Sequence, residues 1–247
     1  MHMIEEVLAA LGADHTTLTN DEKHALDEAG FVLLRDVFSG RQLDECRQLF
    51  DRAVEEQRAP GTNARETGTR HIKNLERFDP LWRVPFHPRI LAAAFHVLNR
   101  RFVCGHPHGR EPLEGFGEQG LHMDWRSAST GGVYYVATAI CLLDAFTRDN
   151  GSTRLVPGSH HLPDLPDRKT ANPSFVHPRQ VNVVAAAGSV LFFNGHLLHS
   201  GTRNRTALRR RTLQTSFTAY EVRGWMISNG ESTPPEDPAF RFLLGEE

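Results

Sequence analysis

Val190-Leu-Phe-Phe-Asn-Gly195 is an apolar run of strand type that ends in a turn signal, and His196 and His199 follow it closely. Short runs of the same kind recur from Arg101 onward, separated by glycine, proline, aspartate and asparagine. Short strands with turn signals between them predict a mainly β sandwich or barrel. The expected strands cover 101–105, 118–125, 132–143, 153–156, 180–184, 189–193 and 207–222.

The first hundred residues have a different character, because their apolar residues mostly recur with the period of a helix. Prolines at 163, 166 and 173 break the segment 162–179, which therefore predicts a surface excursion rather than a central strand. We expect one domain over 1–247, with a mainly helical layer over 1–100, a β core over 101–222 and a tail over 223–247. Within the helical layer, the pattern predicts helices near 3–11, 20–28, 40–58 and 88–99, a strand at 31–34 and mostly loop over 59–80.

Composition excludes several classes of protein. The chain has 247 residues, and a net charge of −2 argues against a nucleic-acid partner. No stretch approaches the roughly 18 apolar residues of a membrane span, and 1–12 lacks the basic residues of a signal peptide. Three widely spaced cysteines give no disulfide framework. We therefore expect a cytoplasmic protein that contacts neither membrane nor nucleic acid.

The strongest local signal is Leu121-His-Met-Asp-Trp125. In a strand, side chains alternate between faces, so His122 and Asp124 point to the same side and can bind one metal ion. A third ligand has to come from elsewhere in the chain. Two histidines and one carboxylate, with one side left open, are typical of non-haem Fe(II) oxygenases, whereas a closed four-ligand site is structural.

Two further segments stand out downstream. Asn150-Gly151 and Pro157-Gly158 are turn signals that need no function to explain them. The third segment begins at His196 and His199 and continues into a basic run with Arg210 at its centre.

The three segments together, in this order, resemble the phytanoyl-CoA dioxygenase family of Fe(II)/2-oxoglutarate-dependent oxygenases. The fuller form Gly115-Phe-Gly-Glu-Gln-Gly-Leu-His122 is similar to a subgroup that modifies natural products in bacteria and fungi. The resemblance covers about residues 100–220 and implies a double-stranded β-helix (jelly-roll, cupin-like) with packed helices. The matching pieces are His122-Met-Asp124-Trp, Asn150-Gly151 with Pro157-Gly-Ser-His160, and His199 followed by Asn204 and Arg210.

The resemblance also implies roles for particular residues. His122, Asp124 and His199 would bind Fe(II), with His196 as the competing distal ligand. Arg210 would bind the far carboxylate of 2-oxoglutarate, because a guanidinium forms two parallel bonds with a carboxylate. Gln119 and Thr153 would hydrogen-bond the same co-substrate, each with a buried structural role as its alternative.

Two positions qualify the resemblance. Many family members carry serine two positions after the distal histidine, but this chain has Gly201 there, so the hydroxyl contact to 2-oxoglutarate has no assigned residue. Related halogenases replace the metal-binding carboxylate with a small residue, and the presence of Asp124 disfavours halogenation. Arg209 and Arg211 are expected to face away from Arg210, towards solvent.

The activity implied is an O₂-dependent oxidation of a C–H bond in a small organic molecule, by hydroxylation or by desaturation, cyclisation or epimerisation. The subgroup points to secondary metabolism such as antibiotic biosynthesis. One alternative is a non-catalytic metal-binding jelly-roll that senses a small ligand and has no need of Arg210. Another is a hydrolase or isomerase that uses Zn(II) or Mn(II). The oligomeric state stays open, and the expected substrate loops are 57–76, 105–118, 162–178 and 221–238.

Overall fold

The computed structural model describes residues 2–57, 66–125, 127, 131–162, 166–225 and 236–246. Helices dominate its first hundred residues, as predicted. The α-helices are α1 (His2–Ala10), α2 (Asn20–Glu28), α3 (Gly40–Glu56), α4 (Pro88–Leu98) and α5 (Pro238–Leu243). The 3₁₀ helices are η1 (Leu75–Arg77), η2 (Leu81–Phe86), η3 (Ser159–His161) and η4 (Tyr220–Trp225).

Antiparallel strands make up the rest of the framework. They are β1 (Phe31–Leu34), β2 (Thr69–Ile72), β3 (Phe102–Cys104), β4 (His108–Pro112), β5 (Val136–Leu142), β6 (Thr153–Leu155), β7 (Val181–Asn182), β8 (Val190–Asn194), β9 (His199–Gly201) and β10 (Thr212–Ala219).

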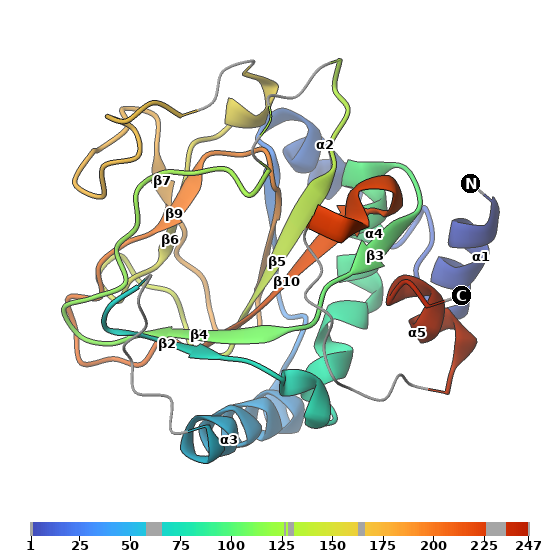
Figure 1. Ribbon diagram of the computed structural model, residues 1–247, viewed down its shortest axis with the longest axis horizontal. Coiled ribbons are helices and arrows are strands. Elements are labelled where there is room, and N and C mark those ends of the chain that lie inside the picture. The colour runs from blue at the N-terminus through green and yellow to red at the C-terminus, as the bar shows by residue number, and fades with distance from the viewer. Residues whose placement is uncertain are drawn as a thin grey trace.

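The strands form two sheets that face each other (Figure 1). The larger sheet has the order β1-β8-β5-β10-β4-β2, with β3 also paired to β10, and the smaller sheet has the order β7-β6-β9. β5 is central, because it pairs with β8 on one side and with β10 on the other. This arrangement is the double-stranded β-helix that the family resemblance implied.

The side-chain alternation of β5 explains how the layers pack. Ala137, Ala139 and Cys141 lie in the core shared with the helices, which cover that face of the larger sheet. Ile140 and Leu142 lie in a second core between the two sheets. One strand therefore serves two apolar layers, as the period of two requires.

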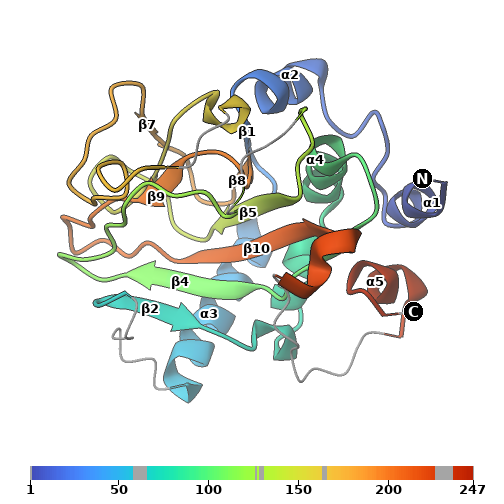
Figure 2. The same ribbon diagram turned by 45° about the horizontal axis from the view of Figure 1, so that its top comes forward.

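The helical layer is held together at both ends of the chain. Thr19 caps α2 through a capping box with Glu22. Near the other end, Phe240 of α5 packs edge-on against Trp82, with ring centroids 5.2 Å apart. Figure 2 shows α1 and α5 side by side at the edge of the larger sheet.

In the part of the chain that is described, no helix has both the length and the apolar character needed to cross a bilayer.

Some elements differ from the prediction. The expected strand over 118–125 is wrong: His122 makes only an isolated bridge to His199, because the backbone around it bonds to His199 and then to Gly195 instead of to one continuous partner strand. The segments 59–80 and 105–118 contain β2 and β4, whose buried polar side chains hide the alternation that marks a strand. Parts of the expected substrate loops, 58–65, 163–165 and 226–235, lie outside the described residues.

Candidate active site

A cavity of about 250 Å³ lies between the two sheets, and the predicted metal ligands line it. β4, β5, β6, β8, β9 and β10 all contribute side chains to its wall. His122, Asp124 and His199 converge there, with one ligand atom from each residue within 4.8 Å of the others. Among the described residues they form the single cluster of this kind, so the fold joins two segments about seventy-five residues apart.

The backbone fixes the three side chains relative to one another. His122 and His199 exchange a pair of hydrogen bonds, N to O at 3.0 Å in one direction and 2.9 Å in the other. Asp124 N donates to the carbonyl of Gly195 at 2.8 Å. The loop that carries the first two ligands is therefore tied by backbone hydrogen bonds to the segment that carries the third.

Hydrogen bonds to the outer atoms determine which ligand atoms are free. Nδ1 of His122 lies 2.9 Å from the carbonyl oxygen of Gly120, and Nδ1 of His199 lies 2.9 Å from that of Leu197. A carbonyl only accepts, so each Nδ1 carries the proton and each Nε2 keeps a lone pair. Thr138 donates to Oδ2 of Asp124 at 2.7 Å, while Oδ1 lies 3.5 Å from Nε2 of His199.

This donor set fits a divalent metal ion. Burial lowers the pKa of His199 below its usual range, against the opposing effect of the Asp124 charge, so the imidazole is neutral at pH 7 and able to bind metal. Each ligand also has an outer partner that fixes its orientation, as in known metal sites. Two imidazoles and one carboxylate match the open three-ligand arrangement of non-haem iron proteins.

Arg210 is the largest fully buried side chain of the described residues, and it faces the same cavity. Nη2 donates to Oγ1 of Thr153 at 3.2 Å, and the guanidinium lies 4.3 Å from the ring centroid of Phe146. Its Nε and Nη1 are buried with no hydrogen-bond partner among the described residues. Burial lowers the pKa of Arg210, and the nearby Arg110 charge adds to that effect. A buried cation with free donors is suited to a carboxylate ligand.

The other predicted polar residues are divided between the cavity and the framework. Gln119 and Thr153 both line the cavity, and Oε1 of Gln119 accepts a hydrogen bond from Gly201 N at 3.0 Å. Asn150 and Asn204 form an isolated bridge instead. The Asn204 amide donates to the carbonyls of Pro112 and Leu208, so these two motif residues shape the turn that leads to Arg210.

The structure also shows where the competing ligand His196 and the neighbours of Arg210 lie. His196 is buried outside the metal cluster, where Nε2 accepts a hydrogen bond from Tyr135 N at 3.2 Å. Arg209 makes ion pairs with Glu111 and Asp51 and does not line the cavity. Arg211 was expected to be solvated, but it is only 8% exposed, because Asp144 and Asp51 pair with it.

Sequence reasoning expected substrate loops at 57–76 and 105–118 but assigned no role to the polar residues there that line the cavity. His71 of β2 and His108 and Arg110 of β4 line the cavity. Glu66 accepts hydrogen bonds from Arg110 and pairs with His71 at 2.9 Å. Burial lowers the pKa of His108 to about 4. No periodic signal marks these residues, because β2 and β4 bury polar groups.

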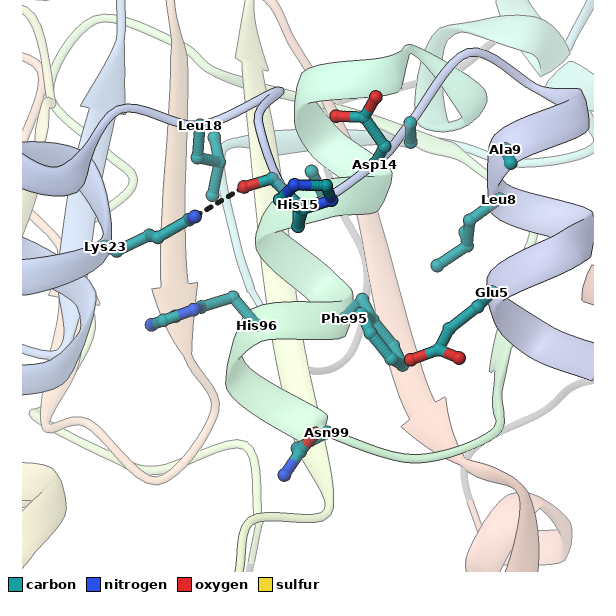
Figure 3. A pocket seen from close by; sticks show the side chains of 12 residues that line it. Glu5, Leu8, Ala9, Asp14, His15, Leu18, Lys23, Phe95, His96 and Asn99 are labelled. Atoms are coloured by element: carbon teal, nitrogen blue, oxygen red, sulfur yellow. Dashed lines mark hydrogen bonds between the residues drawn. The ribbon is translucent and has the colours of Figure 1, made fainter. Parts of the chain in front are cut away.

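A larger cavity of about 570 Å³ lies between α1, α2 and α4, in the helical layer. Figure 3 shows apolar side chains such as Leu8 and Phe95 beside polar ones such as Glu5 and Asp14. Lys23 reaches across to the carbonyl of His15 at 2.5 Å. Among the described residues, this cavity holds no group of three metal-binding side chains. The candidate metal ligands therefore lie in the smaller cavity.

Comparison with known proteins gives one family and several relatives. The family model described as phytanoyl-CoA dioxygenase (PhyH) matches residues 26–212. The "Multifunctional dioxygenase prhA" of Penicillium brasilianum is 32% identical over 108 residues, which are 43% of this chain and 36% of that protein. An uncharacterized Mycobacterium tuberculosis protein, Rv1501, is 25% identical over 221 residues, which are 83% of this chain and 77% of that protein. The match therefore spans about a third of the fungal relative's length.

Solved structures show the same fold. HygX from Streptomyces hygroscopicus, solved with nickel, 2-oxoglutarate and hygromycin B bound, is 20% identical with a TM-score of 0.67, over 82% of this chain and 88% of that one. SnoK, a non-heme alpha ketoglutarate dependent carbocyclase from nogalamycin biosynthesis, is 18% identical with a TM-score of 0.69, over 89% and 94%. At this identity the likeness concerns the jelly-roll itself.

Proposed function

Because the chain belongs to the phytanoyl-CoA dioxygenase family, we propose that it is an Fe(II)- and 2-oxoglutarate-dependent dioxygenase that oxidises a C–H bond of a small organic molecule. The observation that carries the proposal is the pairing, in one cavity, of an open three-ligand cluster with a buried guanidinium that has free donors. The cluster suits a metal with vacant positions, and the guanidinium suits the second carboxylate of a keto diacid.

His122, Asp124 and His199 would hold the iron, and Arg210 with Thr153 would bind the far carboxylate of 2-oxoglutarate. The iron, when bound, supplies activation of O₂ coupled to the conversion of 2-oxoglutarate into succinate and CO₂. The chain's own residues orient the reactants and exclude water. Thr138 holds the Asp124 carboxylate in place, and Phe193 and Ile140 give the inner wall an apolar surface. Each Nδ1 keeps its proton and donates it in a hydrogen bond to a backbone carbonyl, so the histidines move no proton.

A non-catalytic sensor does not explain Arg210. A protein that only binds a metal-bound ligand at the cluster gains nothing from a fully buried cation with free donors, and burying that cation costs several kcal/mol. The same argument applies to a hydrolase or isomerase with Zn(II) or Mn(II) at the cluster. We therefore favour the oxygenase over both.

The substrate class proposed is a secondary metabolite, with hydroxylation, desaturation, cyclisation or epimerisation as the outcome. The support is that HygX is described with the antibiotic hygromycin B and that SnoK belongs to nogalamycin biosynthesis. We further propose that 1–247 is one domain, because one core runs from Ile4 in α1 to Leu243 in α5. Cys46, Cys104 and Cys141 are buried free thiols, which suits the reducing cytoplasm.

The proposal is tested by anaerobic titration of the protein with Fe(II) and then 2-oxoglutarate, following the visible spectrum. A weak metal-to-ligand charge-transfer band that needs both components is the expected result. His122→Ala and Asp124→Ala should abolish the band and the 2-oxoglutarate turnover while the fold persists. His196→Gln is the matched control, a buried histidine outside the cluster. A band that survives both ligand substitutions contradicts the proposed site.

A further inference from the structure

Gly201 lies two residues after His199 and lines the cavity. A Cβ at this position would lie 2.7 Å from the carbonyl oxygen of Gly117 and 3.1 and 3.3 Å from Nη2 and Nη1 of Arg110. These separations are too short for a side chain to be accommodated without displacing its neighbours. The absence of a side chain at Gly201 is therefore what admits the Arg110 guanidinium to this part of the cavity.

Arg110 belongs to the same wall as Arg210. It is the direct cross-strand partner of Thr212, which comes two residues after Arg210. Residues two apart on an extended chain share a face, and both guanidiniums line the cavity between the sheets. The two cations therefore reach the cavity from adjacent positions of one sheet.

Arg110 is held rigidly and still has donors to offer. It is 4% exposed, and its Nε and Nη2 donate to the carboxylate of Glu66. Nη2 also donates to the carbonyl of Gly117 at 3.1 Å. Its hydrogen bonds to the described residues all use Nε and Nη2, which leaves Nη1 for a ligand.

The charges around this end of the cavity do not balance. Arg110 and Arg210 bring two positive charges, and Glu66 brings one negative charge. The Asp124 carboxylate belongs to the metal cluster. Among the described residues one buried positive charge is left over, and a buried charge needs a partner. A single carboxylate placed between the two guanidiniums would balance it and accept hydrogen bonds from both.

We propose that Arg110 is a second co-substrate-binding residue, whose guanidinium contacts the far carboxylate of 2-oxoglutarate together with Arg210 in the space that Gly201 leaves open. This inference rests on the proposed function. Because Gly201 has no hydroxyl group to contact 2-oxoglutarate, the Arg110 guanidinium would supply that contact instead. Arg110 would bind the co-substrate, while Glu66 fixes the orientation of the guanidinium.

The test compares two ligands that differ only at the carboxylate in question. Anaerobic calorimetry on the Ni(II)-loaded protein measures the affinity for 2-oxoglutarate and for 2-oxopentanoate, which has a methyl group in place of the far carboxylate. Arg110→Gln should weaken 2-oxoglutarate binding by about 10- to 100-fold, as expected for a lost charged hydrogen bond. Binding of 2-oxopentanoate should change by no more than about twofold, because its contacts do not involve this end of the cavity.

Two further variants make the result specific. Gly201→Ala keeps every charge but adds a Cβ 2.7 Å from the Gly117 carbonyl oxygen and 3.1 Å from Nη2 of Arg110, in the space proposed for the carboxylate, so it should produce the same selective loss even where Arg110→Gln fails to fold. Arg209→Gln is the matched control, a neighbouring arginine paired with Glu111 and Asp51 that does not line the cavity. It should leave both affinities unchanged.

Other outcomes separate the inference from the proposed function. If Arg210→Gln removes the preference for 2-oxoglutarate but Arg110→Gln weakens both ligands equally, or neither, Arg110 is a structural residue and the inference is wrong while the oxygenase proposal stands. If the wild-type protein binds both ligands equally well, the cavity has no carboxylate anchor, and the proposed function fails together with the inference.

Discussion

Replacing Arg210 with methionine should stabilise the protein without ligand and at the same time abolish 2-oxoglutarate binding. The side chain is fully buried, with Nε and Nη1 unpaired among the described residues. Burying a charge costs several kcal/mol. The Thr153 hydrogen bond offsets about 1 kcal/mol of that cost, and the contact with the Phe146 ring about 2 kcal/mol. Methionine fills a similar volume and packs well on an aromatic ring.

The net gain for the unliganded variant is on the order of 1 kcal/mol, which raises Tm by about 2–4 °C for a chain of this size. Ligand reverses the order of stability. At a hundred times Kd, 2-oxoglutarate should stabilise the metal-loaded wild type by about 2.7 kcal/mol, which raises its Tm by about 5–10 °C. Arg210→Met should lose about 2–5 kcal/mol of binding free energy and show no shift at that concentration.

Thermal unfolding of the wild type and of Arg210→Met is measured for each protein alone and with a redox-inert metal plus 2-oxoglutarate. The four Tm values give both the stability change and the ligand shift. Arg209→Met is the control: its arginine is 42% exposed and forms ion pairs, so both its stability and its ligand shift should stay within about 1 kcal/mol of the wild type. A lower Tm for unliganded Arg210→Met would show that the native guanidinium is already compensated. An unchanged ligand shift would move the carboxylate anchor to another residue.

Three more predictions follow from single contacts. Thr138→Val removes the 2.7 Å hydrogen bond to Asp124, so metal affinity measured by competition with a chelator should fall about 10- to 100-fold; unchanged affinity would mean that the carboxylate is held by other contacts. Thr19→Ala removes a helix cap and should cost about 1 kcal/mol in urea unfolding, with the metal and 2-oxoglutarate affinities unaffected. Burial lowers the pKa of His160 and of His196 to about 4, and the unfolded chain binds these protons near pH 6.5. Stability should therefore fall as pH drops from about 6.5 towards 4, by on the order of 1–3 kcal/mol per imidazole, and His160→Gln should flatten the urea-unfolding profile in that window.

The motif residues divide into two groups when their contacts are compared. His122, Asp124 and His199 turn their free ligand atoms towards one point, which suits a metal ion. Asn150 and Asn204 instead satisfy backbone groups in the turns. The motif therefore contains both metal-binding residues and residues that stabilise the turns beside them. The hydrogen bonds of each side chain distinguish the two roles.

The sequence by itself determined the α-helices of the first layer, the apolar strands β5 and β8, and the candidate ligands His122 and Asp124. Each of these has a local signal: the helix period, an apolar run, or a histidine and a carboxylate two residues apart, whereas His199 came from the family resemblance. The choice of Arg210 over its basic neighbours came from its offset after His199, and the structure adds that the fold buries Arg210 in the cavity while Arg209 and Arg211 pair with carboxylates outside it.

Only the tertiary structure revealed β2, β4 and the polar wall that they carry. Arg110 and Glu66 are charged residues in segments without apolar alternation, so nothing in the local pattern marks the first as buried and the second as largely buried. They can be buried because each supplies the other's charge across forty-four positions of the chain. The role of Gly201 could not be predicted from the sequence either, because it depends on the Arg110 guanidinium, which packs against Gly201 from another strand. Local periodicity reports which residues avoid water, whereas the pairing of buried charges depends on which strands the fold brings together.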